Sequence, residues 1–383
     1  MPVDEESRVK DEGETQVGIA ATIAVMPGDG VGTEIVEAAL QALEAVGNRF
    51  GHQFTTFDVN IGGAAIDAHG VPLRPEDLER CQQADAVLLG AIGGPKWDTL
   101  PVAIRPERGL LALRKGMGLY ANLRPIVVFD SLADTSPVKP EIVRGVDVMV
   151  VRELTGGLYF GRPSKQWQER RGRAAVDTLI YREHEIARVA RLAFELARRR
   201  RKMVASVDKA NVLASSRLWR AVVTEISQEY PDVELEHVLV DTMSMRIIRQ
   251  PSRFDVVVTE NMFGDILTDE ASVLAGSIGL LPSASIGAAR AAGDERRRGV
   301  YEPIHGSAPA MAGQGRANPT GTIMSLAMLL RLSLGLEEEA KAVEDAVRET
   351  IAAGIRTPDI ADSSQPAVTT AEFGRAVAER IRG

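Results

Sequence analysis

Short apolar runs alternate with amphipathic stretches along most of the chain. The runs have the length and the β-branched content of buried strands, and they cover residues 20–26, 54–59, 85–90, 146–151, 203–207, 233–240 and 254–259. Between them apolar residues recur at helical spacing, as Ile186, Val189 and Ala193 do within residues 181–202. This alternation predicts an α/β fold with parallel strands. The last part of the chain is predicted to be helical, over residues 320–334, 337–353 and 370–382.

Length and composition narrow the class of protein. With 383 residues the chain is too long for one simple core and fits two domains. Hydrophobic residues make up 45% and aromatic residues only 4%, so the core must consist mainly of alanine, valine, leucine and isoleucine. The net charge of −8 argues against nucleic acid as a partner. No apolar run reaches membrane-spanning length, which argues against a membrane protein.

Cys81 is the only cysteine, which excludes a disulfide framework or a thiolate zinc site within one chain. The first twenty residues hold six acidic and two basic residues, so we expect a disordered acidic tail over 1–20 and not a targeting peptide. A cytoplasmic location is the resulting expectation. The basic run Arg198–Lys202 ends a predicted helix and is either a solvated helix end or a polyanion site.

Polar residues follow three of the predicted strands. Lys209 follows 203–207, Asp241 follows 233–240, and Asn261 follows 254–259. Functional groups in open α/β sheets gather at such carboxyl ends. Asp265 and Asp269 come next, four residues apart and therefore on one helix face. Carboxylate oxygens suit a hard divalent cation, so this set predicts a metal site; the alternative is a solvated acidic helix face.

The glycine-rich turn Gly28–Gly32 follows the first predicted strand but is a weak signal. It reads G-x-G-x-G, whereas the dinucleotide fingerprint is G-x-G-x-x-G, and Asp58 lies further on than the usual acidic partner. We therefore do not predict the cofactor site there.

Three arginines form the second candidate cluster: Arg114, Arg124 and Arg152. The planar guanidinium group binds carboxylates in a bidentate manner, so together with a metal these residues predict a small substrate with several carboxylates. The alternative is that each arginine is exposed or ion-paired.

Several long motifs resemble the decarboxylating β-hydroxyacid dehydrogenases, the isocitrate/isopropylmalate dehydrogenase family, and within it the branch that acts on 3-isopropylmalate. They are Gly93–Trp97 (GGPKW), Leu111–Lys115 (LALRK), Ala121–Pro125 (ANLRP), Val151–Gly161 (VRELTGGLYFG), Val207–Leu213 (VDKANVL), Asn261–Glu270 (NMFGDILTDE) and Tyr301–Pro309 (YEPIHGSAP). The resemblance extends from about Ile23 to the C-terminus.

The resemblance implies a fold and a reaction. The fold has two domains with a cleft between them and is not a Rossmann fold. The reaction oxidises (2R,3S)-3-isopropylmalate with NAD and releases CO2 and 4-methyl-2-oxopentanoate, in leucine biosynthesis. Related decarboxylating dehydrogenases of tartrate, malate or homoisocitrate are the alternative, and a non-catalytic regulatory paralogue is the least favoured one.

The resemblance also assigns roles to residues. Mg²⁺ or Mn²⁺ is expected on Asp241, Asp265 and Asp269, and the three arginines and Asp241 are expected to bind substrate. Lys209 is the expected base for the hydroxyl proton, and Tyr159 the expected proton donor to the enol carbon. Lys209 and Asp241 are expected from the second subunit of a homodimer, so the active sites are shared.

Substrate and cofactor choice are expected from two further segments. Glu107, Leu110 and Leu111 imply a pocket for the isopropyl group. The expected cofactor residues are Glu302, His305, Gly306, Ser307, Ala308 and Asn318. NAD-using relatives have an aspartate where this chain has Ala310, and NADP-using relatives have Lys-Tyr there. We expect NAD, with Arg316 as a residue that could meet a 2′-phosphate.

The expected domains are discontinuous. Residues 21–119 with 276–383 are predicted to form the cofactor domain. Residues 120–275 are predicted to form the substrate, metal and dimerisation domain, with an arm near 153–176.

Overall fold

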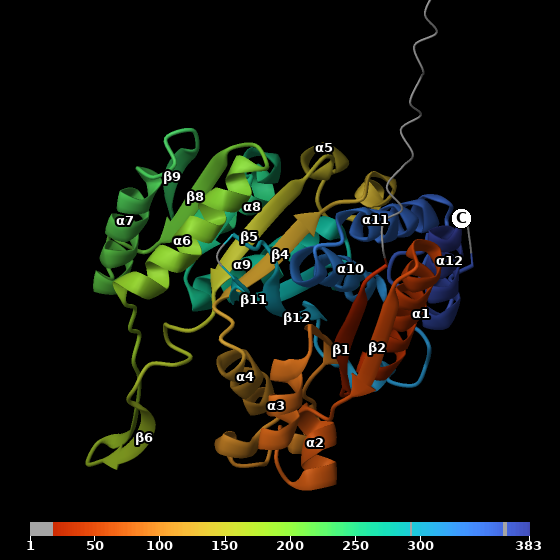
Figure 1. The fold of residues 1–383 in the computed structure, drawn as a ribbon. Coiled ribbons are helices and arrows are strands. Elements are labelled where there is room, and N and C mark those ends of the chain that lie inside the picture. The colour runs from red at the N-terminus through yellow and green to blue at the C-terminus, as the bar shows by residue number, and fades with distance from the viewer. Residues whose placement is uncertain (1–17, 292, 363–365) are drawn as a thin grey trace, which may run out of the picture.

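The described residues form one mixed sheet of ten strands, with helices on both of its faces (Figure 1). The computed structural model describes residues 18–291, 293–362 and 366–383. The strand order is β2-β1-β3-β12-β11-β4-β5-β10-β8-β9. The strands are β1 (Ala20–Gly28), β2 (Gln53–Asp58), β3 (Ala86–Ala91), β4 (Ala121–Val127), β5 (Asp147–Glu153), β8 (Met203–Asp208), β9 (Glu234–Leu239), β10 (Val256–Thr259), β11 (Pro282–Ala289) and β12 (Arg297–Pro303). The predicted α/β class is confirmed.

The helices mostly follow the predicted amphipathic segments. They are α1 (Gly32–Phe50), α2 (Gly62–His69), α3 (Pro75–Gln83), α4 (Glu107–Gly116), α5 (Pro140–Val143), α6 (Glu183–Arg198), α7 (Ala214–Ser227), α8 (Val240–Arg249), α9 (Asn261–Ser272), α10 (Thr320–Leu329), α11 (Glu337–Ala352) and α12 (Thr370–Arg382). In the described ranges, none of them combines the length and the apolar character needed to cross a bilayer.

Predicted strands that are neighbours pair parallel, as expected, but the middle of the sheet is antiparallel. β4 pairs antiparallel with both β5 and β11, and β11 pairs antiparallel with β12. The sequence did not mark β4, β11 or β12 as strands. β4 includes the polar residues Asn122 and Arg124, so it lacks an apolar run, and β11 is rich in alanine and serine. These strands are buried all the same, so tertiary packing overrides local propensity.

Small residues allow helices α1 and α12 to pack closely. α1 and α12 lie side by side, and α1 packs against β1 and β3 (Figure 1). A Cβ on Gly374 of α12 would lie 2.7 Å from the Cβ of Ala38 on α1, so only glycine permits this approach. The core around this contact includes Ile23, Val36 and Phe373, all buried. Close-packed small residues thus compensate for the low aromatic content.

The strand order divides at the contact between β11 and β4. The strands on one side, β2-β1-β3-β12-β11, come from residues 20–91 and 282–303, and those on the other side come from 121–259. These ranges agree with the boundaries predicted at 119/120 and 275/276, although the division into two domains stays a prediction. The predicted acidic tail lies outside the described residues except for 18–20.

A separate hairpin projects from the body of the protein (Figure 1). β6 (Ser164–Glu169) and β7 (Gly172–Asp177) pair only with each other, and every residue of β6 is exposed. An isolated two-stranded hairpin is marginally stable in water. This hairpin overlaps the arm predicted near 153–176.

The basic run after α6 is not a simple solvated helix end. Arg200 and the backbone amide of Arg201 both bind the Asp255 carboxylate at 2.8 Å, and Arg198 pairs with Asp232 at 2.7 Å. Asp255 is buried and directly precedes β10. The run therefore also ties the end of α6 to the residue before β10, while Arg201 stays exposed and the polyanion site stays a prediction.

Asp255→Ala should lower the free energy of unfolding by about 2 kcal/mol, because a buried hub of charge-assisted hydrogen bonds is lost. Asp232→Ala is the matched control, since it removes an exposed partner of the same run and should change stability by less than about 1 kcal/mol. Urea denaturation measures both. Equal losses in the two variants would contradict the role assigned to Asp255.

Candidate active site

Two buried arginines lie side by side on the central strands. Arg124 on β4 and Arg152 on β5 are 8% and 3% exposed. Arg124 donates to Asn122 Oδ1 at 2.8 Å and to Thr268 Oγ1 at 2.5 Å. Arg152 donates to Asn261 Oδ1 at 2.9 Å and to the Asp265 carboxylate. Thr268, Asn261 and Asp265 all lie on α9, so this helix supplies the partners of both guanidinium groups.

The two carboxylates predicted on one face of α9 do lie beside these arginines. Arg124 Nη atoms lie 3.5 Å from both Asp265 and Asp269. Burial acts to raise the pKa of Asp265, but the charges of Arg152 and Arg124 outweigh it and hold this pKa below its ordinary value. Burial raises the pKa of Asp269, and the neighbouring charge of Asp265 adds to the effect. A cation between these carboxylates would offset both the burial of Asp269 and the negative charge of Asp265 beside it. Carboxylate oxygen atoms are ligands for hard divalent metals, so these two residues fit such a metal.

Tyr159 joins this group from the loop after β5. Its hydroxyl donates to Asp265 Oδ2 at 2.9 Å, and the Arg152 guanidinium lies 5.8 Å from the centre of its ring. Burial and the Asp265 charge raise the pKa of Tyr159 to about 12. The side chain is still 42% exposed. Tyr159 is therefore a protonated phenol that solvent or a ligand can reach.

Burial lowers the pKa of both buried arginines. Desolvation, reinforced by the charge of Arg124, lowers the pKa of Arg152 to about 10. Desolvation likewise lowers the pKa of Arg124. Arg114 contributes to both shifts through its charge, so the three predicted arginines form one cluster. Such a cluster is a strong attractor for an anion that can replace the lost hydration.

Arg114 pairs with a residue predicted to serve the cofactor. Its Nη2 lies 2.5 Å from Glu302 Oε1, and both side chains are almost fully buried. Arg114 lies in the last turn of α4, and Glu302 lies near the end of β12. The expected substrate and cofactor residues thus meet at this ion pair.

The segment expected to choose the substrate lies on the same helix. Leu110 and Leu111 are half-buried on α4, and Leu110 packs partly against the core beneath β1 and β3. Glu107 is exposed, and its Oε1 lies 3.0 Å from where a Cβ would stand on Gly93. An added side chain at Gly93 would therefore press on Glu107.

Lys209 and Asp241 form a separate pair, 2.5 Å apart. Asp241 lies in the first turn of α8 and not at the end of a strand, because β9 ends at Leu239. The hydrogen bond from Lys209 lowers the pKa of Asp241. Within the described part of one chain, no three histidine, cysteine, aspartate or glutamate side chains come together as a metal site would require. Asp241 therefore does not join Asp265 and Asp269 in a single chain.

The glycine turn supports the loop in which the cofactor residues were expected. The Val31 amide donates to Ser307 O at 2.8 Å, and a Cβ on Gly30 would lie 1.9 Å from that same oxygen. Ser307 Oγ in turn donates to Gly93 O at 2.6 Å. Asp29, which the sequence did not single out, accepts the backbone amides of Gly63, Ala64 and Gly93. The turn therefore holds these loops together.

The remaining expected cofactor residues line up along residues 305–318. His305 Nδ1 and Gly306 O are 2.8 Å apart, and burial lowers the pKa of this histidine. Ala308 has a left-handed φ of 37°, which is unusual for a residue with a Cβ. Asn318 donates to Asp359 at 3.0 Å and caps the amide of Thr320. Ala310 and Arg316 are both exposed.

Three buried residues beneath this site had no signal in the sequence. Glu153, Tyr181 and Glu260 are each under 9% exposed and contact the segments that carry Arg152, Tyr159 and α9. Glu153 stands next to Arg152 in a motif, but no local pattern marks Tyr181, whose partner Asn261 is 80 residues away.

Comparison with known proteins agrees with this arrangement. The family model described as isocitrate/isopropylmalate dehydrogenase matches residues 22–377. Among solved structures, the isocitrate dehydrogenase of Methylococcus capsulatus has a TM-score of 0.82 and 35% identity, covering 95% of this chain and all of that one. The β-decarboxylating dehydrogenase of Thermococcus kodakarensis has a TM-score of 0.75 and 35% identity, covering 94% and 96%.

The chain therefore belongs to the isocitrate/isopropylmalate dehydrogenase family of oxidoreductases, as the motifs predicted. A protein of Geobacillus kaustophilus named 3-isopropylmalate dehydrogenase is 58% identical over 351 residues, covering 92% of this chain and 93% of that protein. A protein of Bacillus subtilis with the same name is 56% identical over 350 residues, covering 91% and 94%. Membership implies a small-molecule substrate, a nicotinamide cofactor and a divalent metal in general.

Glu302→Ala should lower the free energy of unfolding by about 3 kcal/mol, because it leaves the Arg114 guanidinium buried without its carboxylate. The double variant Arg114→Met/Glu302→Met removes both charges and should recover part of that loss. Chemical denaturation of the single and double variants measures the difference. A double variant less stable than Glu302→Ala would contradict the assigned pairing.

Proposed function

We propose that the protein oxidises (2R,3S)-3-isopropylmalate with NAD and releases CO2 and 4-methyl-2-oxopentanoate, as a step of leucine biosynthesis. The observation that carries this proposal is the cluster of three buried arginines beside the carboxylates of α9. The shared name of relatives at 53–59% identity supports it.

The charges of the cluster favour a substrate with two carboxylates. Arg114, Arg124 and Arg152 stand against Glu302, Asp265 and Asp269, so the set is neutral by itself. A divalent cation adds two positive charges, which a dicarboxylate balances. A third carboxylate near Leu110 and Leu111 would lose its hydration without a partner, whereas burying an isopropyl group there is favourable by roughly 2 kcal/mol.

Asp265 and Asp269 would hold Mg²⁺ or Mn²⁺ together with Asp241 of a second copy of the chain. When bound, the metal supplies positive charge beside the substrate oxygen that becomes negative. The oxygen donors of the three aspartates suit either ion. Arg114, Arg124 and Arg152 would bind the two carboxylates of the substrate and orient it.

The protein groups would then move protons in sequence. Lys209 accepts the proton of the substrate hydroxyl while the carbon-bound hydrogen leaves as hydride to NAD. The carboxylate on the neighbouring carbon, β to the new ketone, leaves as CO2, and the electron pair of the broken carbon–carbon bond forms the enolate. Tyr159 donates a proton to the enol carbon, a step for which its high pKa keeps it protonated beforehand.

A homodimer would complete the site, because one chain separates Lys209 and Asp241 from Asp265. Val212, Leu218 and Met245 are exposed apolar residues on the flank that carries the Lys209–Asp241 pair. A second copy packed on this flank would bury them. The two halves of the sheet would form the two domains, and the hairpin β6–β7 would form the arm. The protein would act in the cytoplasm.

The proposed cofactor is NAD, held by Glu302, the loop residues His305, Gly306, Ser307 and Ala308, and Asn318. The buried Nε2 of His305 has no partner among the described residues, which is consistent with a ligand at this loop. Exposed Ala310 provides neither a carboxylate for ribose hydroxyls nor a cation for a 2′-phosphate.

NAD reduction followed by absorbance, with Mn²⁺ and each of 3-isopropylmalate, malate, tartrate, homoisocitrate and isocitrate, tests the proposed substrate. We expect kcat/KM for 3-isopropylmalate to exceed that for every other acid at least tenfold, because only its side chain is apolar and branched. A preference for malate or tartrate would reassign the enzyme within its family, and no turnover of any acid would contradict catalysis.

Mixing two inactive variants tests the shared site. Lys209→Ala and Asp265→Asn should each abolish turnover as homodimers, while Lys209→Ala keeps its affinity for 3-isopropylmalate. A co-expressed mixture forms heterodimers with one intact site, so we expect roughly a quarter of wild-type turnover. A mixture as inactive as its parents would show that both residues serve the same chain's site.

Ala310→Asp tests cofactor choice. We expect the wild type to prefer NAD by kcat/KM and the variant to widen this preference about tenfold, because a carboxylate accepts ribose hydroxyls and repels a 2′-phosphate. A wild-type preference for NADP would contradict the assignment. Arg316→Ala then serves to show whether Arg316 is the cause.

A further inference from the structure

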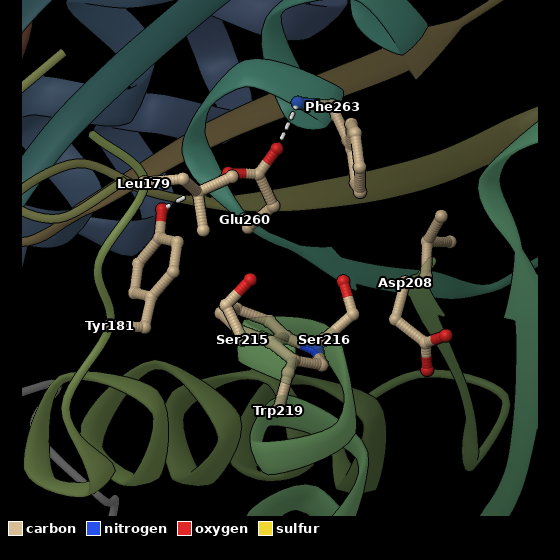
Figure 2. Close-up of a pocket in the computed structure, with 9 residues that line it drawn as sticks. Leu179, Tyr181, Asp208, Ser215, Ser216, Trp219, Glu260 and Phe263 are labelled. Atoms are coloured by element: carbon tan, nitrogen blue, oxygen red, sulfur yellow. Dashed lines mark hydrogen bonds between the residues drawn. The ribbon is translucent and has the colours of Figure 1, made fainter. Parts of the chain in front are cut away.

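A buried phenol joins three segments of the candidate site. Tyr181 precedes α6 and is 7% exposed, with its ring edge-on to Trp219 at a centroid distance of 5.7 Å. Its hydroxyl accepts the backbone amide of Asn261 at 2.9 Å and lies 3.4 Å from Glu260 Oε2 (Figure 2). Glu260 caps α9 by accepting the Phe263 amide at 2.7 Å. The phenol therefore holds the beginning of α9 from below.

The contact with Asn261 continues to the substrate arginine. Asn261 is 1% exposed and accepts Arg152 Nε at 2.9 Å, and its amide nitrogen donates to Gly156 O at 3.3 Å. Arg152 in turn contacts Asp265. One chain of hydrogen bonds thus leads from the Tyr181 hydroxyl to the carboxylate proposed to bind metal.

The loop that carries Tyr159 rests directly on the same ring. A Cβ on Gly156 would lie 2.6 Å from the Tyr181 ring, and a Cβ on Gly157 would lie 2.7 Å from its hydroxyl oxygen. The Gly157 amide donates to Ile180 O at 3.0 Å, so the loop also follows the backbone just before Tyr181. The two glycines therefore allow the loop that carries Tyr159 to pack directly on the Tyr181 ring, and this contact sets the distance between loop and ring.

Two buried carboxylates surround the phenol. Glu153 is fully buried, accepts the amides of Thr155 and Gly156 at 2.8 Å, and also interacts with the Tyr181 hydroxyl. A cavity of about 10 Å³ beside Glu260 and Tyr181 is lined by Ser215 and Ser216 (Figure 2), which is about the space of one water molecule. The phenol has one hydroxyl hydrogen and two acidic neighbours, Glu153 and Glu260.

We propose that Tyr181 is a positioning residue for the dehydrogenase reaction: its hydroxyl places Arg152 through Asn261, and its ring places Tyr159 through Gly156 and Gly157. This inference rests on the proposed function. Tyr181 itself would not touch substrate, and its role explains why a polar network is buried under the arginines.

Tyr181→Phe tests the hydroxyl and keeps the ring against Trp219. We expect kcat to fall about 10- to 100-fold, because small displacements of catalytic groups have effects of this size. The KM for 3-isopropylmalate should rise several-fold through Arg152, whereas the KM for NAD should stay within twofold. Tyr301→Phe is the matched control, since it loses a buried hydroxyl contact to Ser333 at 2.7 Å in the other half of the sheet; its kcat should stay within twofold.

A glycine pair keeps the test decisive if Tyr181→Phe does not fold. Gly157 and Gly145 have φ values of 76° and 70°, so alanine is similarly strained in both, but a Cβ on Gly145 meets nothing within 4 Å. Gly157→Ala should lower kcat at least tenfold relative to Gly145→Ala, because only its methyl group presses on the Tyr181 hydroxyl. Equal kcat in the two glycine variants, or wild-type kcat and KM in Tyr181→Phe, would overturn the proposal.

Hydrogen exchange separates this proposal from the proposed function. In Tyr181→Phe, amides in peptides covering 153–161 and 260–266 should exchange faster than in the wild type, and Tyr301→Phe should not change them. Unchanged exchange in Tyr181→Phe would overturn the positioning role. If the wild type does not oxidise 3-isopropylmalate, the proposed function fails, and exchange alone still decides whether Tyr181 places these segments.

Discussion

The rest of the site depends on the burial of two guanidinium groups between the central strands and α9. A buried charge without a partner is strongly destabilising, so Arg124 and Arg152 require the polar face of α9 to lie against β4 and β5. That requirement accounts for Thr268, Asn261 and Asp265 on the inner side of the helix. The carboxylates therefore lie next to the arginines. One structural constraint thus accounts for both the acidic groups that suit a metal and the basic groups that suit an anion.

The antiparallel strands in the middle of the sheet bring the three arginines together. β4 enters between β5 and β11, which brings Arg124 beside Arg152 and places Arg114, at the end of α4, within reach of both charges. β12 then contributes Glu302 as the partner of Arg114. The strands that surround the site, β12, β11, β4 and β5, are thus the ones at which the two halves of the sheet meet.

Much of this could be predicted from the sequence, because the signals were local. The apolar runs marked strands such as β3 and β8, and the four-residue spacing of Asp265 and Asp269 placed both on one helix face. β4 and β11 were missed because their residues are polar or small, and their burial depends on distant partners. Tyr181 was missed for the same reason, since its hydroxyl acts on residues far along the chain.

The central claim is that Asp265 presents its carboxylate to a metal while the arginines hold it in place. Titration of Mn²⁺ followed by electron paramagnetic resonance tests this most directly. The account predicts saturable binding in the wild type, loss of affinity of about tenfold or more in Asp265→Asn, and no change in Glu270→Gln, whose carboxyl lies next along α9. Equal Mn²⁺ affinity in the wild type and Asp265→Asn would contradict it.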